Sequence, residues 1–282
     1  MYYISVENQK GNSLALTEGN GYQVVDISGL NPPNANINTT NMAMGDGSIF
    51  NSSSLANRNI IITLYIPSDL DNKRIDLYKY FRPKQFCRLY FRNAKRNVYI
   101  DGYVETFDIT LFAITQKVQI SIICPSPTLK DTQVQEYNFS WTNDNFQFPF
   151  AIEETGVEFG YMESISYVNV INNGDTDTGV TIELNANGNV LNPTIRNLAT
   201  GERFTINFEM IEGDLIKITT GLGNKKITLL RDGVETNIIN YVQKNPSWFT
   251  LSSGDNPFSY SCDEGTGVLN LKFSLQNEYL GV

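Results

Sequence analysis

The chain has 282 residues, of which 41% are hydrophobic and 18% charged, a composition typical of a globular protein of about two domains. Its formal net charge of −9 disfavours nucleic-acid binding through bulk phosphate neutralisation. Histidine is absent, which excludes Ser-His-Asp and Cys-His nucleophile systems and every zinc site that contains histidine.

The three cysteines predict a reduced protein. Cys87, Cys124 and Cys262 are far apart and odd in number, so we expect apolar filler side chains and not a disulfide framework or a metal site. The first residues do not have the basic and then apolar pattern of a secretory signal, and no apolar run approaches the roughly 20 residues that span a bilayer. We therefore expect folding in a cytoplasm and no membrane partner.

Alternating hydrophobic and polar residues dominate the chain and predict a mostly β protein. Short runs rich in Ile, Val, Tyr, Phe and Thr predict strands at 22–27, 59–66, 86–91, 97–105, 117–124, 167–171, 180–184, 215–219 and 269–275. One segment differs: residues 69–81 place Leu70, Leu77, Tyr78 and Phe81 near one stripe, which predicts a single short helix.

Residues 28–57 form an unusually long segment with little apolar periodicity. We interpret it as a long loop, and loops of this length in compact domains are usually functional or mobile. Two hypotheses remain open: an arm that becomes ordered against a neighbouring subunit, or a flexible hairpin extension without a partner.

A domain boundary is predicted near residue 130. Two prolines follow Cys124 at 125 and 127, where the periodicity stops. Residues 1–130 carry 13 basic and 10 acidic side chains, whereas residues 131–282 carry 8 and 20. The balances of +3 and −12 favour two domains, 1–130 and 131–282, with different surroundings.

Carboxylates are the main candidates for catalysis, because a glycoside hydrolase needs two of them across a cleft. The densest pairs are Glu153-Glu154 and Asp263-Glu264. Neighbouring residues in a strand point to opposite faces, so neither pair can itself form a facing dyad in a strand. A dyad assembled from remote positions stays open, and we rank an enzyme third among the functions.

Two further motifs fail their consensus. Residues 173–179 alternate oxygen ligands as an EF-hand loop does, but Thr178 occupies the position that must be glycine. We expect a solvated turn between strands there. Residues 221–225 do not have the spacing of a P-loop, and no dinucleotide-binding motif follows a strand, so we predict no cofactor.

A basic cluster interleaved with aromatic residues is more informative. Its nine members lie within 24 positions: Lys73, Arg74, Lys79, Arg82, Lys84, Arg88, Arg92, Lys95 and Arg96. Basic and aromatic residues together suggest nucleic-acid contact. Arg88, Tyr90 and Arg92 also alternate with apolar residues as in a strand with one wet face, so a subunit interface and a plain solvated face remain open beside it.

Several stretches occur in the order of a known family. RIDLYKYF, NVYIDGYVETFD and QISIICPSP in the first half resemble the N-terminal domain of siphophage distal tail proteins (Dit), or siphovirus-type tail components. The second half resembles their C-terminal domain, through Asn173-Gly174-Asp175, Thr200-Gly201-Glu202, Trp248-Phe249 before Gly254-Asp255-Asn256, and the final Tyr279-Leu280-Gly281-Val282. These residues have structural interpretations as turns, core positions and a strand anchor, so none is assigned a catalytic, cofactor or metal role.

The resemblance implies a non-enzymatic hub of the phage tail tip, folded and assembled in the host cytoplasm. Its N-terminal domain, a β-sandwich or split barrel with one helix, would close a ring around the channel through which DNA passes, and the resemblance implies that this ring is a hexamer. The ring would join the tail tube protein to the tail-tip (Tal) protein. Its C-terminal galectin-like β-sandwich would carry receptor-binding or baseplate proteins.

The alternative is a carbohydrate-binding protein that adheres to the host wall through the second domain. Sandwich lectins use exposed aromatic residues, and Trp141, Tyr161 and Trp248 are available for that role. A buried core position is the competing interpretation for Trp248.

Overall fold

The structure is a computed structural model that describes residues 2–17, 19–111, 116–143, 161–164 and 167–282. It divides into two compact units, Met1–Thr132 with Glu278–Val282 and Gln133–Asn277. The chain therefore passes between the units twice. The last five residues were expected in the second domain, but they belong to the first unit, because they pair with a strand of its sheet.

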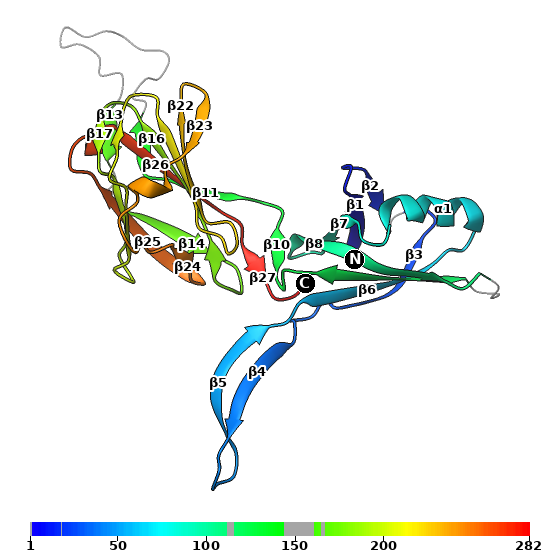
Figure 1. The fold of residues 1–282 in the computed structure, drawn as a ribbon. Helices are drawn as coiled ribbons and strands as arrows, with labels where there is room; N and C mark the ends of the chain where they lie inside the picture. Colours follow the sequence, from blue (N-terminus) through cyan, green and yellow to red (C-terminus); the bar gives the residue numbers. More distant parts are fainter. Residues whose placement is uncertain (1, 18, 112–115, 144–160, 165–166) are drawn as a thin grey trace, which may run out of the picture. The chain divides into compact units, whose positions relative to one another are not determined.

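The first unit is built on a nine-stranded antiparallel sheet (Figure 1). Seven strands follow the order β2-β1-β7-β8-β9-β6-β3, and β10 pairs with both β8 and β27. Their bounds are β1 (Tyr3–Asn8), β2 (Ser13–Ala15), β3 (Gln23–Ser28), β6 (Arg58–Tyr65), β7 (Phe86–Arg92), β8 (Asn97–Ile109), β9 (Lys117–Cys124), β10 (Leu129–Asp131) and β27 (Glu278–Tyr279).

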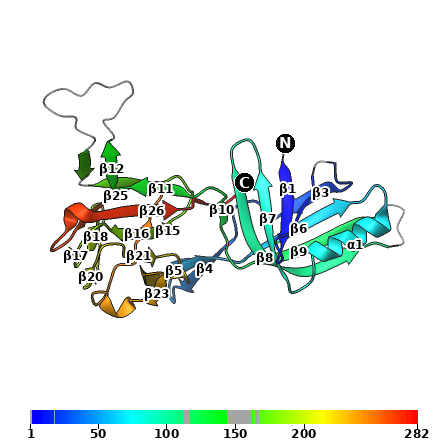
Figure 2. The ribbon, with the colours of Figure 1, turned by 90° about the horizontal axis from the view of Figure 1, so that it is seen from above.

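Alternation along these strands explains the core of the first unit. In β6, Ile60, Ile62 and Leu64 are fully buried, while the residues between them are partly exposed. Helix α1 (Leu70–Tyr80) packs on the sheet (Figure 2), and buries Leu77 and, just after its end, Phe81. It is the one α-helix among the described residues, at the place that the sequence predicts.

Residues 28–57, predicted as a loop, contain an ordered β-hairpin instead. Strands β4 (Ala35–Asn41) and β5 (Ser48–Leu55) pair with each other alone and leave the sheet between β3 and β6 (Figure 1). Every residue of both strands is exposed. The loop interpretation was wrong because strands without a core beneath them have no regular apolar alternation to detect.

The second unit is a β-sandwich. Its two larger sheets have the orders β11-β26-β16-β21-β22-β23 and β14-β25-β18-β19. The bounds of these strands are β11 (Gln135–Asn138), β14 (Val168–Asn172), β16 (Thr181–Ala186), β18 (Thr194–Asn197), β19 (Arg203–Thr205), β21 (Leu215–Thr219), β22 (Lys226–Arg231), β23 (Val234–Asn237), β25 (Gly254–Ser261) and β26 (Leu269–Leu275). Short pairs and two 3₁₀ turns complete it: β12 (Ser140–Asn143) with β13 (Tyr161–Ser164), β15 (Thr178–Gly179) with β24 (Thr250–Leu251), β17 (Val190–Leu191) with β20 (Glu209–Met210), η1 (Ile239–Tyr241) and η2 (Thr266–Val268).

Facing aromatic rings fill the interior of the second unit. Phe258 lies 5.2 Å from Phe249 and 4.9 Å from Phe273, measured between ring centroids. All three side chains are fully buried. Such a set of close ring pairs adds directional contacts to the apolar burial that joins the sheets. The mostly β fold of two units is thus confirmed, and no helix among the described residues is long and apolar enough to cross a bilayer.

Candidate assembly surfaces

The β4–β5 hairpin has two chemically different faces. Its register pairs Ala35 with Leu55, Ile37 with Ser53 and Thr39 with Phe50, and directly paired residues share a face. Ile37, Phe50 and Leu55 therefore lie together on one face, where their exposed fractions are 58%, 60% and 43%. This apolar face is therefore largely exposed to solvent in the single chain.

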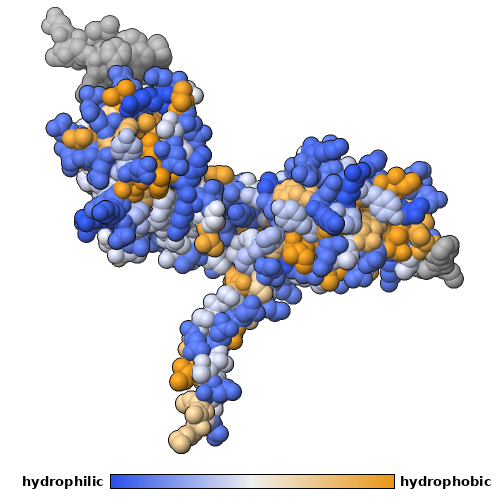
Figure 3. Space-filling view, viewed as in Figure 1, coloured by the Kyte–Doolittle hydropathy of each residue, from blue (hydrophilic) through white to orange (hydrophobic). Residues whose placement is uncertain are grey.

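The opposite face of the hairpin is polar. Asn38 Nδ2 donates a hydrogen bond to Ser52 Oγ at 3.0 Å, and Asn51 Nδ2 donates to Thr40 Oγ1 at 2.7 Å. Ile49 is the exception on this face, opposite Thr40. The two strands contain no charged residue. Figure 3 shows hydrophobic residues at the surface of this ribbon, and an uncharged, one-sidedly apolar hairpin is suited to contact with protein.

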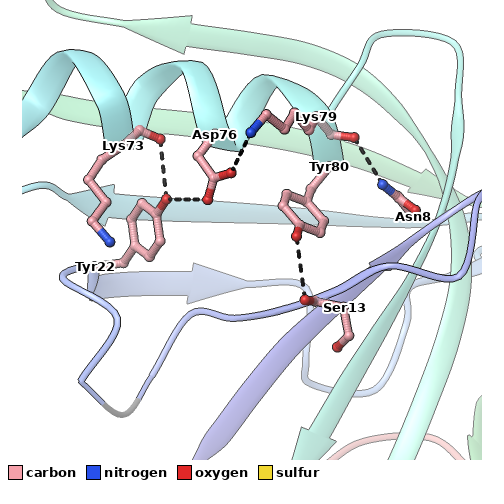
Figure 4. Close-up of polar contacts among 7 residues, drawn as sticks. All are labelled: Asn8, Ser13, Tyr22, Lys73, Asp76, Lys79 and Tyr80. Carbon is pink, nitrogen blue, oxygen red and sulfur yellow. Dashed lines mark hydrogen bonds and ion pairs between the residues drawn. The ribbon is translucent and has the colours of Figure 1, made fainter.

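Helix α1 is held by hydrogen bonds to Tyr22, just before β3, and to Asn8 at the end of β1 (Figure 4). The Tyr22 hydroxyl donates to the Lys73 carbonyl oxygen at 3.2 Å and lies 3.4 Å from a carboxylate oxygen of Asp76. Burial, with the Asp76 charge, raises the pKa of Tyr22 above its usual range, so the phenol stays a donor. At the other end, Asn8 Nδ2 donates to the Lys79 carbonyl oxygen at 3.1 Å. The helix is thus fixed on its sheet.

The basic cluster is spread over this helix and the strands after it, and internal partners take up much of its charge. On the helix, the Arg74–Asp71 and Lys79–Asp76 ion pairs measure 3.1 and 3.2 Å. On β7, Arg88 forms two hydrogen bonds with Asp101, at 2.6 and 3.0 Å. Two members stack on rings: the Arg92 guanidinium lies 4.7 Å from the Tyr3 centroid, and that of Arg96 lies 4.3 Å from Tyr279.

These contacts favour a structural role for the cluster. A site that binds phosphates needs cationic groups free to displace counterions. Arg88 instead carries a bidentate carboxylate partner on the neighbouring strand β8. The sequence interpretation as a nucleic-acid surface receives no support from this arrangement, whereas the wet strand face that it predicts is present in β7, where Arg88 and Tyr90 are half-buried between buried Cys87, Leu89 and Phe91.

An open pocket of about 270 Å³ lies at the end of α1, lined by Tyr78, Phe81, Arg82, Pro83 and Phe107. The Tyr78 ring meets that of Phe107 edge-on, with 5.0 Å between the centroids. Its walls combine apolar rings with one guanidinium.

Among the aromatic candidates for carbohydrate binding, Trp248 alone has a described side chain. Trp248 is half-buried and packs edge-on against the buried ring of Phe204, 5.2 Å between centroids. The side chains of Trp141 and Tyr161 lie outside the described residues. The core interpretation of Trp248 is therefore the one that its contacts favour.

The polar motifs of the second unit have structural contacts where they are described. Residues 173–177 form the turn between β14 and β15, and Asn172 Nδ2 donates across it to the carbonyl oxygens of Thr176 and Leu251 at 2.9 and 3.0 Å. Asp263 accepts a hydrogen bond from Asn192 Nδ2 at 2.8 Å. The pair Glu153-Glu154 lies outside the described residues, within which no group of three potential metal ligands among His, Cys, Asp and Glu occurs.

All three cysteines are free thiols. Cys87 and Cys124 are fully buried in the core of the first unit, and burial raises the pKa of each to about 12. Cys262 is partly buried, and burial raises its pKa to about 11. Their burial agrees with the expectation that they are apolar filler side chains.

Comparison with known proteins identifies both units. The model of the phage tail protein RIFT-related domain matches residues 9–124, and that of the siphovirus-type tail component, C-terminal domain, matches residues 173–276. No curated protein sequence matches the chain.

Solved structures agree with the family matches on the fold. The crystal structure of the Dit protein (gp 19.1) of phage SPP1, described as a paradigm of the hub adsorption apparatus in phages that infect Gram-positive hosts, is 12% identical with a TM-score of 0.67, over 97% of this chain and 98% of that one. A chain in the baseplate of phage P2 in its activated conformation is 11% identical to this chain in both the Ca and the Sr structure. The TM-score is 0.54 over 100% of both chains for the Ca structure, and 0.51 over 98% of both chains for the Sr structure. The chain, a phage tail component, belongs to the siphophage distal tail protein (Dit) family, the siphovirus-type tail components.

Proposed function

We propose that the protein is the ring-forming hub of the tail tip, a hexamer in which each copy is joined to the next through the β4–β5 hairpin. The observation that carries the proposal is the apolar hairpin face around Ile37 and Phe50, which is more than half exposed in the single chain. A second copy of the first unit covers this face and pairs with the open strand edges of the hairpin.

Closure into a ring explains why an exposed hairpin of this kind is tolerated. A ribbon with open backbone edges would otherwise promote open-ended association, whereas in a closed ring each hairpin contacts one neighbouring copy and no contact surface is left open. The near-balanced charge of residues 1–130 permits close approach of copies, whereas a copy of residues 131–282 repels its neighbours through a balance of −12. We therefore assign residues 1–130 to the ring and place residues 131–282 at its outside.

The partners follow from this arrangement and from the family. The ring joins the tail tube protein on one side to the tail-tip protein on the other, with DNA passing through its channel. The acidic second unit carries receptor-binding or baseplate proteins. The basic side chains of the first unit that are paired with carboxylates, such as Arg88 with Asp101, suit a ring that lets DNA slide past.

Light scattering across a concentration series and negative-stain electron microscopy test the proposal. We expect a mass of six chains and a ring with a central opening, for the protein alone or together with the tail tube protein. A protein that is strictly monomeric at high concentration, and remains so with the tail tube protein, would contradict it.

A further inference from the structure

The segment Glu278–Val282 docks on the first unit as an added strand with side-chain anchors. β27 pairs with β10 through Leu129 and Tyr279 and through Lys130 and Glu278. The Tyr279 ring packs against the core of the first unit, and its hydroxyl donates to Asp131 Oδ2 at 3.2 Å. Docking of this kind, a short strand held by backbone bonds and one aromatic anchor, is how proteins bind extended peptides.

Arg58 lies at the centre of this docking site. It is 3% exposed, and its guanidinium donates four hydrogen bonds to backbone carbonyl oxygens. These run from Nε to Pro127 at 2.9 Å, from Nη1 to Gly29 at 2.5 Å and Asn31 at 2.9 Å, and from Nη2 to Leu280 at 2.7 Å. A buried guanidinium is tolerated only when its N–H groups have hydrogen-bond acceptors. Removal of any one of these segments would leave an N–H group of Arg58 buried without its acceptor, and this would weaken the packing of the other segments.

The segments that Arg58 joins include the root of the hairpin. Gly29 and Asn31 lie between β3 and β4, and Arg58 begins β6 after the two residues that follow β5. Gly29 has a φ of +87°, and a Cβ there would lie 2.1 Å from the Asn59 carbonyl oxygen, so this side of the root is closely fitted.

The docked segment touches this root directly as well. The Val282 amide donates to the Leu30 carbonyl oxygen at 3.3 Å. A Cβ at Gly281 would lie 3.2 Å from the same oxygen and 3.3 Å from Pro32 Cδ. Arg96 also donates to the Gly281 carbonyl oxygen. The segment thus completes the packing at the base of the hairpin.

We propose that the first unit contains a peptide-binding groove for Glu278–Val282, and that occupation of this groove fixes the root of the β4–β5 hairpin. The last five residues of the chain, which belong to the first unit, thereby control the element proposed to join neighbouring copies. The role of the groove in assembly rests on the proposed ring, because both involve the β4–β5 hairpin. The groove itself is a property of the single chain.

Hydrogen–deuterium exchange on the full chain tests the groove. In a Gly281→Val variant, we expect at least tenfold faster exchange of the Ala56 amide, which is bonded to the Asn34 carbonyl oxygen at the hairpin root. The amide of Ile218, in the sheet of the second unit, serves as an internal reference and should not change. Gly267→Val is the matched control, because no atom lies within 4 Å of the Cβ position there.

A second experiment separates the groove from a general loss of stability. The chain shortened after Asn277 should show the same fast exchange at Ala56, and a synthetic peptide of residues 277–282 should restore protection where a scrambled peptide does not. Unchanged exchange in both Gly281→Val and the shortened chain, or no rescue by the peptide, would overturn the proposal. Absence of rings with normal rescue would contradict the proposed function and leave the groove intact.

Discussion

Replacing Ile37 with serine removes an apolar side chain from the hairpin face that we assign to the contact between copies. Ile37 is 58% exposed in the single chain, so a neighbour can bury somewhat more than half of its side chain. Complete burial of an isoleucine is worth about 1.5–3 kcal/mol, which gives about 1–1.5 kcal/mol for each contact. Because every copy in a closed ring loses the same amount, the concentration at half assembly should rise about tenfold.

Ile49→Ser is the matched control for this change. Ile49 has the same exposed fraction, 58%, but lies on the polar face of the same hairpin, opposite Thr40. Both substitutions remove the same atoms from an exposed strand, so the free energy of unfolding of the single chain should change by less than about 0.5 kcal/mol in each. Only Ile37→Ser should weaken assembly.

Sedimentation velocity over a hundredfold range of concentration measures the midpoint of assembly for the natural sequence and both variants. Phe50→Ser, on the same face as Ile37 and 60% exposed, should reproduce the effect of Ile37→Ser. Equal midpoints for Ile37→Ser and Ile49→Ser would refute the assignment of the apolar face. The assignment would also be refuted if neither substitution shifted the midpoint of assembly from that of the natural protein.

Three further predictions concern the single chain. Asp214→Asn should lower the free energy of unfolding of the second unit, measured by urea titration, by about 2 kcal/mol. The reason is that the Asp214 side chain is 1% exposed and accepts two hydrogen bonds from Arg231, at 2.7 and 2.5 Å, and one from the Ile211 amide. The control Glu235→Gln changes an exposed ion pair and should leave the free energy of unfolding unchanged. The contacts with Arg231 and the Ile211 amide hold the pKa of Asp214 below its usual value. The contribution of Asp214 to the free energy of unfolding is therefore complete above about pH 4 and is lost as the pH falls through the lowered pKa. In an acid titration followed by circular dichroism, Asp214→Asn should lose less stability than the natural protein. Burial raises the pKa of Cys87 and Cys124 to about 12 and that of Cys262 to about 11. All three thiols should therefore react slowly with a disulfide reagent at about pH 8 in the folded protein and completely in urea. A fast reaction in the folded state would contradict their buried positions.

The sequence predicts those elements that bury one face. Strand β6 was expected at 59–66 and is found at Arg58–Tyr65, because Ile60, Ile62 and Leu64 repeat every second residue over a core. Helix α1 was expected from the spacing of Leu70, Leu77 and Phe81, two of which are buried. The periodic spacing of apolar residues arises from burial of one face, so it detects only those strands and helices that contribute to a core.

Both surfaces that carry the proposals escape detection by the same reasoning. Ile37 and Phe50 share a face only through the pairing of β4 with β5, and a bulge between Asn38 and Thr39 shifts the register, so no fixed spacing in the sequence brings them together. Strand β27 has two residues, too few for any period. The sequence assigns Tyr279 as an anchor correctly but places it in the wrong unit.

Arg58 shows why a buried charge cannot be found from one sequence. It precedes the apolar run of β6, where a basic residue predicts a solvated strand end, yet it is 3% exposed. Its acceptors are carbonyl oxygens of Gly29, Asn31, Pro127 and Leu280, which any residue type could supply and which lie up to 222 positions from Arg58 in the sequence. A cation that binds carboxylates leaves an acidic partner in the sequence, whereas one that binds backbone leaves none. In this phage tail component, one side chain connects distant segments through their backbone carbonyl groups, and such connections become visible only in the fold.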